Sequence, residues 1–368
     1  MTASTIKYGI IGTGGMANSH AEHLSKIEGV ELAACLDINA ERSQAFAEKH
    51  GFAHAVTEMP RLLEQCDAVS VVTPDAFHAS ISLQVLASND THLLCEKPLT
   101  TTLEDAREVA REAQRAADDH GIVHMVNFSY RNAAAFQRAR ELVVAGELGE
   151  IRHVTGRYFQ QWLSTDIWDN WTSEQWLWRI KTPKDGGPAS GGVLGDVGCH
   201  LMDFVTGIAG DADRIRCRMR TFPKIHPETG AGVDTWDGEK LDANDTVTIE
   251  LDLTGGGLGA LEASRWTTGH PNQVACGVYG TKGAIEIDLE DSYTKLRTCL
   301  GENAVKAEWH VEELDPTPNN WERFITSIRT GVNDQADVVR GAQIQSYLDA
   351  CERSAEADGA SMTVEPWI

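Results

Sequence analysis

A glycine-rich segment near the N-terminus constrains the fold of this chain most. The segment GTGGMA, residues 12–17, directly follows the apolar run Ile6–Ile11, and Asp37 closes the next apolar run. In a strand–turn–helix unit, the first glycine allows a sharp turn, the second allows the backbone to approach a pyrophosphate, and Ala17 allows the helix to pack closely on the strand. The helix N-terminus then directs its unpaired N–H groups at the phosphates. The pattern predicts a dinucleotide-binding unit, and a glycine-rich turn without a ligand is the alternative.

Asp37 indicates which dinucleotide is bound. A carboxylate at this position accepts hydrogen bonds from both adenosine ribose hydroxyls and repels a 2′-phosphate, which favours NAD over NADP. The residues that we expect to contact NAD are Gly12, Thr13, Gly14, Gly15, Met16, Asp37, Ile38, Thr73, Pro74, His78, Glu96, Lys97 and Asn127.

Length and composition exclude several classes of protein. With 368 residues, of which 42% are hydrophobic, about two domains are expected. The eight cysteines never form a CxxC motif and lie mostly in apolar runs, so we expect reduced thiols and neither a disulfide framework nor a metal site. The N-terminus lacks a signal sequence, and no apolar run is long enough to span a membrane. The net charge of −23 disfavours nucleic acid and anionic membranes as partners. These features predict a cytoplasmic protein.

The pattern of apolar runs changes along the chain. Strand-like runs separated by helical spacing predict a parallel, doubly wound sheet, and they lie at residues 6–11, 31–36, 67–73, 91–95 and 122–126. Further on, period-two alternation and short glycine turns predict a mainly antiparallel sheet with one polar face, from runs at 151–161, 215–220, 246–253, 258–266, 274–279 and 284–289. We therefore expect an α/β protein with a Rossmann domain at 1–127 and a substrate-binding and oligomerisation domain at 128–368.

Two motifs follow strands of the expected parallel sheet. In CEKPLT, Glu96 and Lys97 lie at the carboxyl edge of the sheet, where open α/β proteins bind ligands, and Pro98 restricts the direction of Lys97. The alternative is an exposed lysine at a strand end. In VVTPDAFH, Thr73 and Pro74 end a strand and His78 follows in the turn. His78 is expected to contact the cofactor, or else to be a capping or solvated histidine.

The segment SGGVLGDVGCHLMDFVTG carries a second polar cluster. Asp196 and His200 are four residues apart and would share one helix face, with Asp203 one turn further. A carboxylate raises the basicity of a neighbouring imidazole and holds its orientation, so His200 could take a hydroxyl proton as hydride leaves the same carbon. A capped helix with a buried polar pair is one alternative. A metal site is another, but the sequence nominates no clear third ligand.

Five of the ten tryptophans lie within seventeen residues: Trp162, Trp168, Trp171, Trp176 and Trp178. Their rings suit the apolar faces of a sugar, and they suit a core or a subunit interface equally well. The cations Arg179, Lys181 and Lys184 follow and could bind an anionic group of a ligand, although solvated loop charges are the better interpretation. The residues assigned to substrate binding are Lys97, Trp162, Trp178, Arg179, Lys181, Asp196 and His200.

Together the GxGxxA turn, Asp37, the TP dipeptide before His78, the EKP tripeptide and GDVGCHLMD resemble the glucose-fructose oxidoreductase and inositol dehydrogenase family, Gfo/Idh/MocA. The resemblance spans nearly the whole chain. It implies a Rossmann domain, a second α/β domain with an open antiparallel sheet, and a homodimer or homotetramer packed through that sheet. It also implies that Lys97, Asp196 and His200 are the catalytic residues. Cys199 stands where many members have serine, and the tryptophan-rich segment resembles sugar-oxidising members more loosely.

Three functions are compatible with these features. The first is NAD-dependent transfer of hydride from a carbinol of a sugar or cyclitol, in which His200 takes the proton, Lys97 stabilises the alkoxide and Asp196 orients His200. The second is an NAD-dependent glycosidase that oxidises the sugar transiently, eliminates the aglycone, adds water and returns the hydride; the cations at 179–184 would then bind an acidic group of the sugar. The third is a non-catalytic NAD-binding regulator, which the retention of all three polar residues disfavours.

Overall fold

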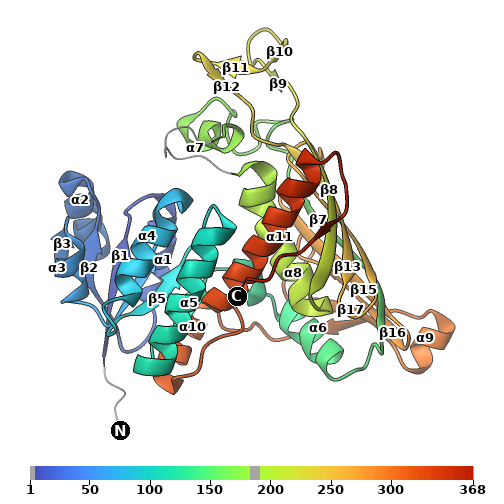
Figure 1. Ribbon diagram of the computed structural model, residues 1–368, viewed down its shortest axis with the longest axis horizontal. Helices are drawn as coiled ribbons and strands as arrows, with labels where there is room; N and C mark the ends of the chain where they lie inside the picture. The colour runs from blue at the N-terminus through green and yellow to red at the C-terminus, as the bar shows by residue number, and fades with distance from the viewer. Residues whose placement is uncertain (1–4, 183–190, 368) are drawn as a thin grey trace. The chain divides into compact units, whose positions relative to one another are not determined.

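The chain folds into two compact units in the computed structural model, which describes residues 5–182 and 191–367 (Figure 1). One unit comprises the chain up to Ser129 together with Pro318–Gln345, and the other comprises Tyr130–Thr317 together with Ser346–Pro366. The polypeptide therefore returns to its first unit after completing most of the second.

The first unit is built on a six-stranded parallel sheet with the strand order β3-β2-β1-β4-β5-β6. The order reverses between β1 and β4, which places a topological switch point where their carboxyl ends meet. The strands are short and almost continuously apolar, as expected for a sheet covered on both faces. They are β1 (Ile6–Ile11), β2 (Val30–Leu36), β3 (His54–Val56), β4 (Ala68–Val71), β5 (His92–Cys95) and β6 (His124–Val126).

Helices connect these parallel strands. Two of them begin with a side-chain cap that satisfies an otherwise unpaired backbone N–H: Asn39 caps α2 and Thr102 caps α5. Both end at a glycine in the left-handed region, Gly51 and Gly121. The helical elements are α1 (Gly15–Leu24), α2 (Ala40–His50), α3 (Met59–Leu63), η1 (Asp75–Phe77), α4 (His78–Leu86) and α5 (Leu103–His120).

The first unit also contains α10 (Asn320–Thr330), which the expected division into 1–127 and 128–368 places in the other domain. The apolar face of α10 explains the difference. Trp321 stacks on His23 with ring centroids 4.1 Å apart, and Phe324 meets Tyr8 edge-on. A capping box at Asn319 and a left-handed Gly331 delimit this helix. The division between the units falls within α11 (Val338–Glu356).

The second unit is built on a nine-stranded sheet with the order β18-β17-β16-β15-β7-β14-β13-β8-β19. Within the described residues of this sheet, β7 and β14 pair in parallel and the other neighbouring strands pair antiparallel. The expected α/β fold with a parallel sheet and a mainly antiparallel second sheet is thus confirmed. The strands are β7 (Ile151–Phe159), β8 (Ala212–Arg220), β13 (Thr246–Leu253), β14 (Leu258–Ser264), β15 (Gln273–Gly280), β16 (Gly283–Asp288), β17 (Lys295–Leu300), β18 (His310–Glu313) and β19 (Met362–Thr363).

Helix α8 (Cys199–Ala209) packs very closely on the second sheet. A Cβ at Gly156 of β7 would lie 2.6 Å from the Val205 side chain, so glycine is needed at this point of β7. Gly207, on α8, meets Phe136 in the same way and brings α6 (Ala134–Val144) alongside. The remaining helical elements of this unit are η2 (Ser129–Asn132), α7 (Glu174–Leu177), η3 (Trp178–Ile180), the π-helical turn η4 (Leu194–Gly198) and α9 (Glu302–Lys306).

A small tryptophan-rich module projects from one end of the second sheet, at the top of Figure 1. It has its own core of Trp162, Leu163, Trp171, Ile180 and Leu241. Two short hairpins complete it, formed by β9 (Lys224–Ile225) with β10 (Gly232–Val233) and by β11 (Thr235–Trp236) with β12 (Glu239–Lys240).

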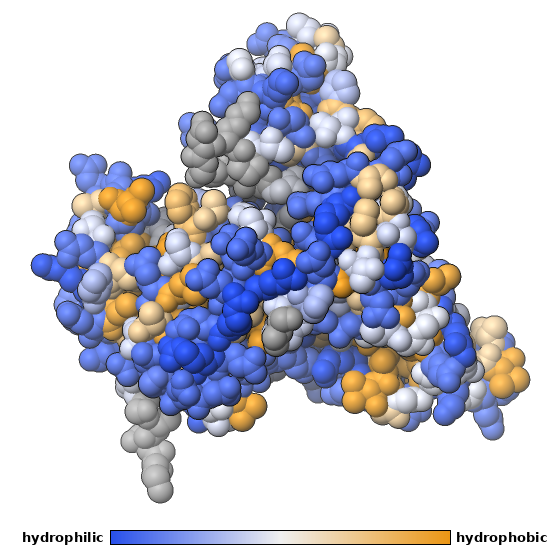
Figure 2. All heavy atoms as spheres, viewed as in Figure 1, coloured by the Kyte–Doolittle hydropathy of each residue, from blue (hydrophilic) through white to orange (hydrophobic). Residues whose placement is uncertain are grey.

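Hydrophilic residues predominate on the face drawn in Figure 2, where apolar residues gather only in small groups. On the second sheet, the exposed positions of β8 and β13 pair basic with acidic residues, as at Arg216 and Glu250. This alternation agrees with the predicted sheet that has one polar face. Among the helices of the described residues, none is both long and apolar enough to cross a membrane.

Candidate functional site

The turn between β1 and α1 is shaped to receive a phosphate group. Gly12 has a φ of +91°, and a Cβ there would lie 2.8 Å from the Val72 carbonyl oxygen, so only glycine fits. A Cβ at Gly14 or Gly15 would meet nothing within 4 Å, which leaves open space beside the backbone. Gly14 provides no side-chain cap for α1. Among the described residues, no side chain therefore caps the first N–H groups of α1, and the turn fits the pyrophosphate of a dinucleotide.

Asp37 lies at the end of β2 with a fully engaged carboxylate. Its Oδ2 accepts from the Thr13 backbone N–H at 3.2 Å and the Thr13 hydroxyl at 2.7 Å, and its Oδ1 accepts from the Asn39 N–H at 2.9 Å and Arg42 Nη2 at 3.0 Å. Burial opposes ionisation, but these hydrogen bonds together hold the pKa of Asp37 below its ordinary value. The carboxylate is therefore charged. Ile38 and Met16, both expected to contact the cofactor, are exposed apolar side chains.

Glu96 is the centre of a buried network in the first unit. Its Oε1 meets His20 Nε2 at 2.9 Å and accepts from Asn127 Nδ2 at 2.5 Å, while its Oε2 accepts the Lys97 backbone N–H at 3.2 Å. Burial alone would raise the pKa of this carboxyl. The hydrogen bond to His20 and the other polar contacts have the larger effect, and together they lower the pKa to about 2. Two expected cofactor contacts, Glu96 and Asn127, thus bond to each other, and Glu96 also accepts the backbone N–H of Lys97.

Sequence reasoning did not identify His20 as part of this network. The only available signal was its place on α1 directly after the glycine-rich turn, where one helix face must pack on the sheet. Its other ring nitrogen meets the Ser70 hydroxyl at 2.9 Å, and Ser70 in turn bonds to Tyr8.

His78 lies at the N-terminus of α4 and is 1% exposed. Its Nδ1 is 2.8 Å from the Pro98 carbonyl oxygen and its Nε2 is 2.9 Å from the Thr73 carbonyl oxygen. Both ring nitrogens thus connect the turns that follow β4 and β5, and the expected contact of His78 with the cofactor stays a prediction. The hydroxyl of Thr73, by contrast, is buried and has no hydrogen-bond partner in the described residues.

In the second unit, Asp196 occupies the π-helical turn that precedes α8. Arg265 Nη2 donates to its Oδ2 at 2.8 Å, and Arg179 Nε lies 3.4 Å from the same oxygen. Arg265 is completely buried, follows β14 directly, and also donates to the Arg179 carbonyl oxygen at 2.7 Å. The prediction that Asp196 and His200 share one helix face assumes α-helical geometry between them. A π-helical turn is wider, so the four-residue spacing no longer places the two side chains directly above one another. Sequence reasoning missed Arg265, which follows an apolar strand without any recognisable motif.

His200 lies one residue into α8 and is 7% exposed. Its ring meets Tyr130 edge-on, with centroids 5.0 Å apart, and Tyr130 bonds to the Tyr158 hydroxyl. Burial and the neighbouring Tyr130 raise the pKa of Tyr158 well above its ordinary value, which leaves it protonated. Tyr158 therefore supplies a neutral phenol group near the imidazole, through its bond to Tyr130.

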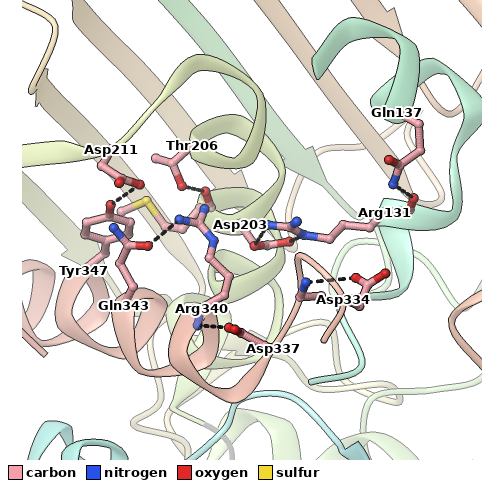
Figure 3. A network of polar contacts seen from close by, with 12 residues as sticks. Arg131, Gln137, Asp203, Thr206, Asp211, Asp334, Asp337, Arg340, Gln343 and Tyr347 are labelled. Atoms are coloured by element: carbon pink, nitrogen blue, oxygen red, sulfur yellow. Dashed lines mark hydrogen bonds and ion pairs between the residues drawn. The ribbon is translucent and has the colours of Figure 1, made fainter. Parts of the chain in front are cut away.

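Asp203 has a structural partner within the same unit. Arg131 Nε and Nη2 each donate to one of its carboxylate oxygens at 2.7 Å, and both side chains are 3% exposed (Figure 3). This bidentate ion pair ties η2 to α8. Among the described residues, no three histidine, cysteine, aspartate or glutamate side chains group as a metal site would require.

The tryptophans and cations of the module that were assigned to substrate binding contact other residues of the module. Trp162 is 1% exposed in the module core, which is the core alternative rather than an open sugar platform. Trp178 is partly exposed and carries the Arg179 guanidinium 4.3 Å above its ring. Lys181 forms an ion pair with Glu239. Lys184 lies outside the described residues.

Comparison with known proteins identifies the family to which this fold belongs. Residues 6–128 match the model of an oxidoreductase family with an NAD-binding Rossmann fold, and residues 136–286 match the GFO/IDH/MocA C-terminal domain. The chain is 30% identical to the D-glucoside 3-dehydrogenase of Escherichia coli strain K12, over 97% of both chains. It belongs to the Gfo/Idh/MocA family.

Two further Gfo/Idh/MocA proteins are similar to this chain. The levoglucosan dehydrogenase of Pseudarthrobacter phenanthrenivorans is 28% identical over 69% of the chain, and the match spans 64% of that enzyme, slightly less than two thirds of its length. A levoglucosan dehydrogenase structure in complex with NADH has a TM-score of 0.81 and 22% identity, covering 99% of this chain and 100% of that one, which shows the shared fold. The family, the turn before α1 and the charged Asp37 make this chain an NAD-binding oxidoreductase.

Proposed function

We propose that this chain is an NAD-dependent dehydrogenase that oxidises a secondary hydroxyl of a sugar or cyclitol. The observation that carries the proposal is the start of α8, where a buried imidazole follows a carboxylate that Arg265 holds at 2.8 Å. The names of the similar proteins, a D-glucoside 3-dehydrogenase and a levoglucosan dehydrogenase, support a sugar substrate. They also favour net oxidation over the glycosidase alternative.

The chain's residues divide the chemistry as follows. Bound NAD would supply the acceptor for the hydride of the carbinol carbon. His200 takes the hydroxyl proton, Lys97 stabilises the developing alkoxide, and Asp196 binds a neighbouring hydroxyl. Because Arg265 donates a hydrogen bond to Asp196, the carboxylate is held in place as a hydrogen-bond acceptor. The proposal also requires that Lys97 and His200 act on the same substrate carbon.

A neutral substrate agrees with the charges near Asp196. Arg179 pairs with Asp196 and lies over the Trp176 and Trp178 rings, and Lys181 pairs with Glu239. An anionic group on the substrate would have to compete with these carboxylates for its cations. We therefore place neutral pyranosides and anhydrosugars ahead of acidic or phosphorylated sugars.

The test is to incubate the protein and NAD with neutral sugars, sugar phosphates, cyclitols and aryl glycosides, while following both NADH and released aglycone. Stoichiometric NADH with a neutral sugar is expected. Aglycone release without net NADH would establish the glycosidase instead, and preferred turnover of a sugar phosphate would contradict the neutral substrate.

Substitutions test the three residue roles. Lys97→Ala and His200→Ala should each lower kcat by about a hundredfold or more, because each removes a group that acts on the reacting hydroxyl. The matched controls are Lys295→Ala and His270→Ala, which remove partly exposed side chains paired with Asp291 and Glu290. Near-normal turnover by His200→Ala would show that another group accepts the proton.

We also propose, from the family resemblance, a cytoplasmic homodimer or homotetramer. The open second sheet, with its row of exposed charged pairs, provides a surface of suitable extent. The mass in solution by light scattering decides between these assemblies and a monomer.

A further inference from the structure

The tryptophan-rich module carries a lysine whose side chain is completely buried. Lys224, in β9, donates from its Nζ to Asp245 Oδ2 at 2.6 Å and to the Phe222 carbonyl oxygen at 2.8 Å. The side chains of Lys224 and Asp245 are both 0% exposed. Strand β9 is tied to the module core, because Trp171 Nε1 donates to the Ile225 carbonyl oxygen at 2.9 Å. Lys224 therefore connects this core to Asp245, which directly precedes β13 of the large sheet.

Stability alone does not account for this ion pair. Taking two charges out of water costs about as much free energy as their mutual attraction returns, and uncharged side chains of similar volume often stabilise a core equally well. A different role is indicated by the surroundings of Asp245, because this residue and its neighbour Asn244 are connected by hydrogen bonds to the turn that carries Asp196.

Two chains of hydrogen bonds lead to Asp196 from Asn244 and Asp245. In the first, the Asn244 side-chain oxygen accepts the Leu194 N–H at 2.9 Å, within the π-helical turn that contains Asp196. In the second, the Asp245 carbonyl oxygen accepts the Arg265 N–H at 3.0 Å, and Arg265 Nη2 donates to Asp196 Oδ2 at 2.8 Å. The position of the Asp196 carboxylate thus depends on where these two residues lie.

We propose that Lys224 is a positioning residue for Asp196. Through its ion pair with Asp245, it holds the backbone of Asn244 and Asp245, and this backbone in turn holds both the π-helical turn and Arg265. The tryptophan-rich module therefore contributes to sugar binding by keeping the Asp196 carboxylate in place. This inference rests on the proposed function, in which Asp196 binds a hydroxyl of the substrate.

The test variant is Lys224→Met combined with Asp245→Asn, which removes both charges and keeps an oxygen that can accept the Phe222 N–H. Its melting temperature should stay close to that of the native chain, because no unpaired charge is buried. The KM for the sugar should rise by about tenfold or more, with a smaller change in KM for NAD. In an Arg265→Met background the same change should raise the sugar KM by a smaller factor, because both substitutions act through Asp196.

Hydrogen exchange supplies a readout that does not depend on turnover. The amide N–H groups of Val193 and Leu194, which donate to Asn244, should exchange faster in the test variant by about tenfold or more. The matched control is Arg323→Met combined with Asp334→Asn, which removes an ion pair of the first unit whose side chains are 12% and 13% exposed. This control should leave both the exchange of the two amides and the KM for the sugar unchanged.

If the test variant does not fold, Asp245→Glu replaces it, since this change keeps both charges but displaces the carboxylate. Native-like exchange of the two amides would overturn the proposal, and so would faster exchange with an unchanged KM for the sugar. An equal rise in both KM values with a fall in melting temperature would show a general structural role and would also overturn it. If the native chain oxidises no sugar, the proposed function fails, whereas the exchange rates still decide whether the ion pair holds the turn.

Discussion

At the scale of single residues, His78 is a buried titratable group of the nucleotide-binding unit with a partner at each ring nitrogen. Both of its ring nitrogens face carbonyl oxygens, which only accept hydrogen bonds. A neutral imidazole has one N–H, so one nitrogen lone pair would then face a carbonyl oxygen. Burial lowers the pKa of His78, but the neighbouring Cys95 and the two carbonyl groups outweigh it and raise the pKa to about 9. His78 is therefore an imidazolium at neutral pH.

This charge state has a consequence for stability. Because the pKa rises from 6.5 to about 9 on folding, the stabilisation is fully present below pH 6.5 and is lost as the pH rises through 9. The difference corresponds to on the order of 3 kcal/mol. The free energy of unfolding of the native protein should therefore fall more steeply between pH 6.5 and 9 than that of His78→Gln.

Nitrogen NMR of the histidine rings provides the direct measurement. His78 should retain both N–H protons at pH 8. Equal pH dependence of stability in the native protein and His78→Gln, together with a neutral ring at pH 8, would contradict the assignment.

At the scale of elements, the π-helical turn before α8 is held by contacts from far along the chain. The Asn244 side-chain oxygen accepts from the Leu194 N–H at 2.9 Å, and the Asn244 carbonyl oxygen accepts from the Val193 N–H at 2.8 Å. Gly192, with a φ of +68°, lies directly against Asn244. Together with Arg265 on Asp196, these contacts determine where the carboxylate points.

Arg265 is therefore a positioning residue, and its substitution should act through Asp196. Arg265→Met keeps the bulk but removes the donor at 2.8 Å, so we expect KM for the sugar to rise by about tenfold or more, with a smaller change in KM for NAD. Arg265→Lys should recover part of the loss. A purely structural role would instead lower the melting temperature without separating the two KM values, and Arg218→Met on an exposed position of β8 is the control.

These contacts also explain what the sequence could and could not predict. The strands of the parallel sheet follow from their apolar runs, and α10 follows from its cap at Asn319 and its end at Gly331. Strand β3 has only three residues and no buried run, so its pairing with β2 decides its conformation. The π-helical turn was missed because Asn244 and Arg265, which shape it, are about fifty to seventy residues away along the chain.

At the scale of the whole molecule, the C-terminal segment 318–345 completes the nucleotide-binding unit. It covers the edge strand β6, where the Val126 N–H donates to the Ala336 carbonyl oxygen at 2.7 Å. A Cβ at Gly341 would lie 2.7 Å from the Val126 side chain, so the contact is close. A sheet edge without this cover would expose unpaired backbone groups.

The apolar side chains of α10 determine how much this segment stabilises the nucleotide-binding unit. Phe324 and Ile325 are fully buried and Trp321 is 6% exposed. Each such side chain contributes about 1.5–3 kcal/mol on burial, so the three together contribute on the order of 6 kcal/mol. Because domains are stable by only about 5–15 kcal/mol, their loss is comparable with the entire stability of the unit.

We therefore predict that a fragment ending at Ser129 does not fold cooperatively, whereas the same fragment joined by a flexible linker to residues 318–345 does. Thermal unfolding with and without NAD is the measurement: the joined fragment should give a single transition that NAD raises, since a ligand that binds the native state stabilises it. Introducing Trp321→Ala and Phe324→Ala into the joined fragment should abolish the transition if burial of the α10 face is responsible. A cooperative, NAD-sensitive transition in the fragment ending at Ser129 would instead show that the first 129 residues form a complete domain, with α10 as an addition to it.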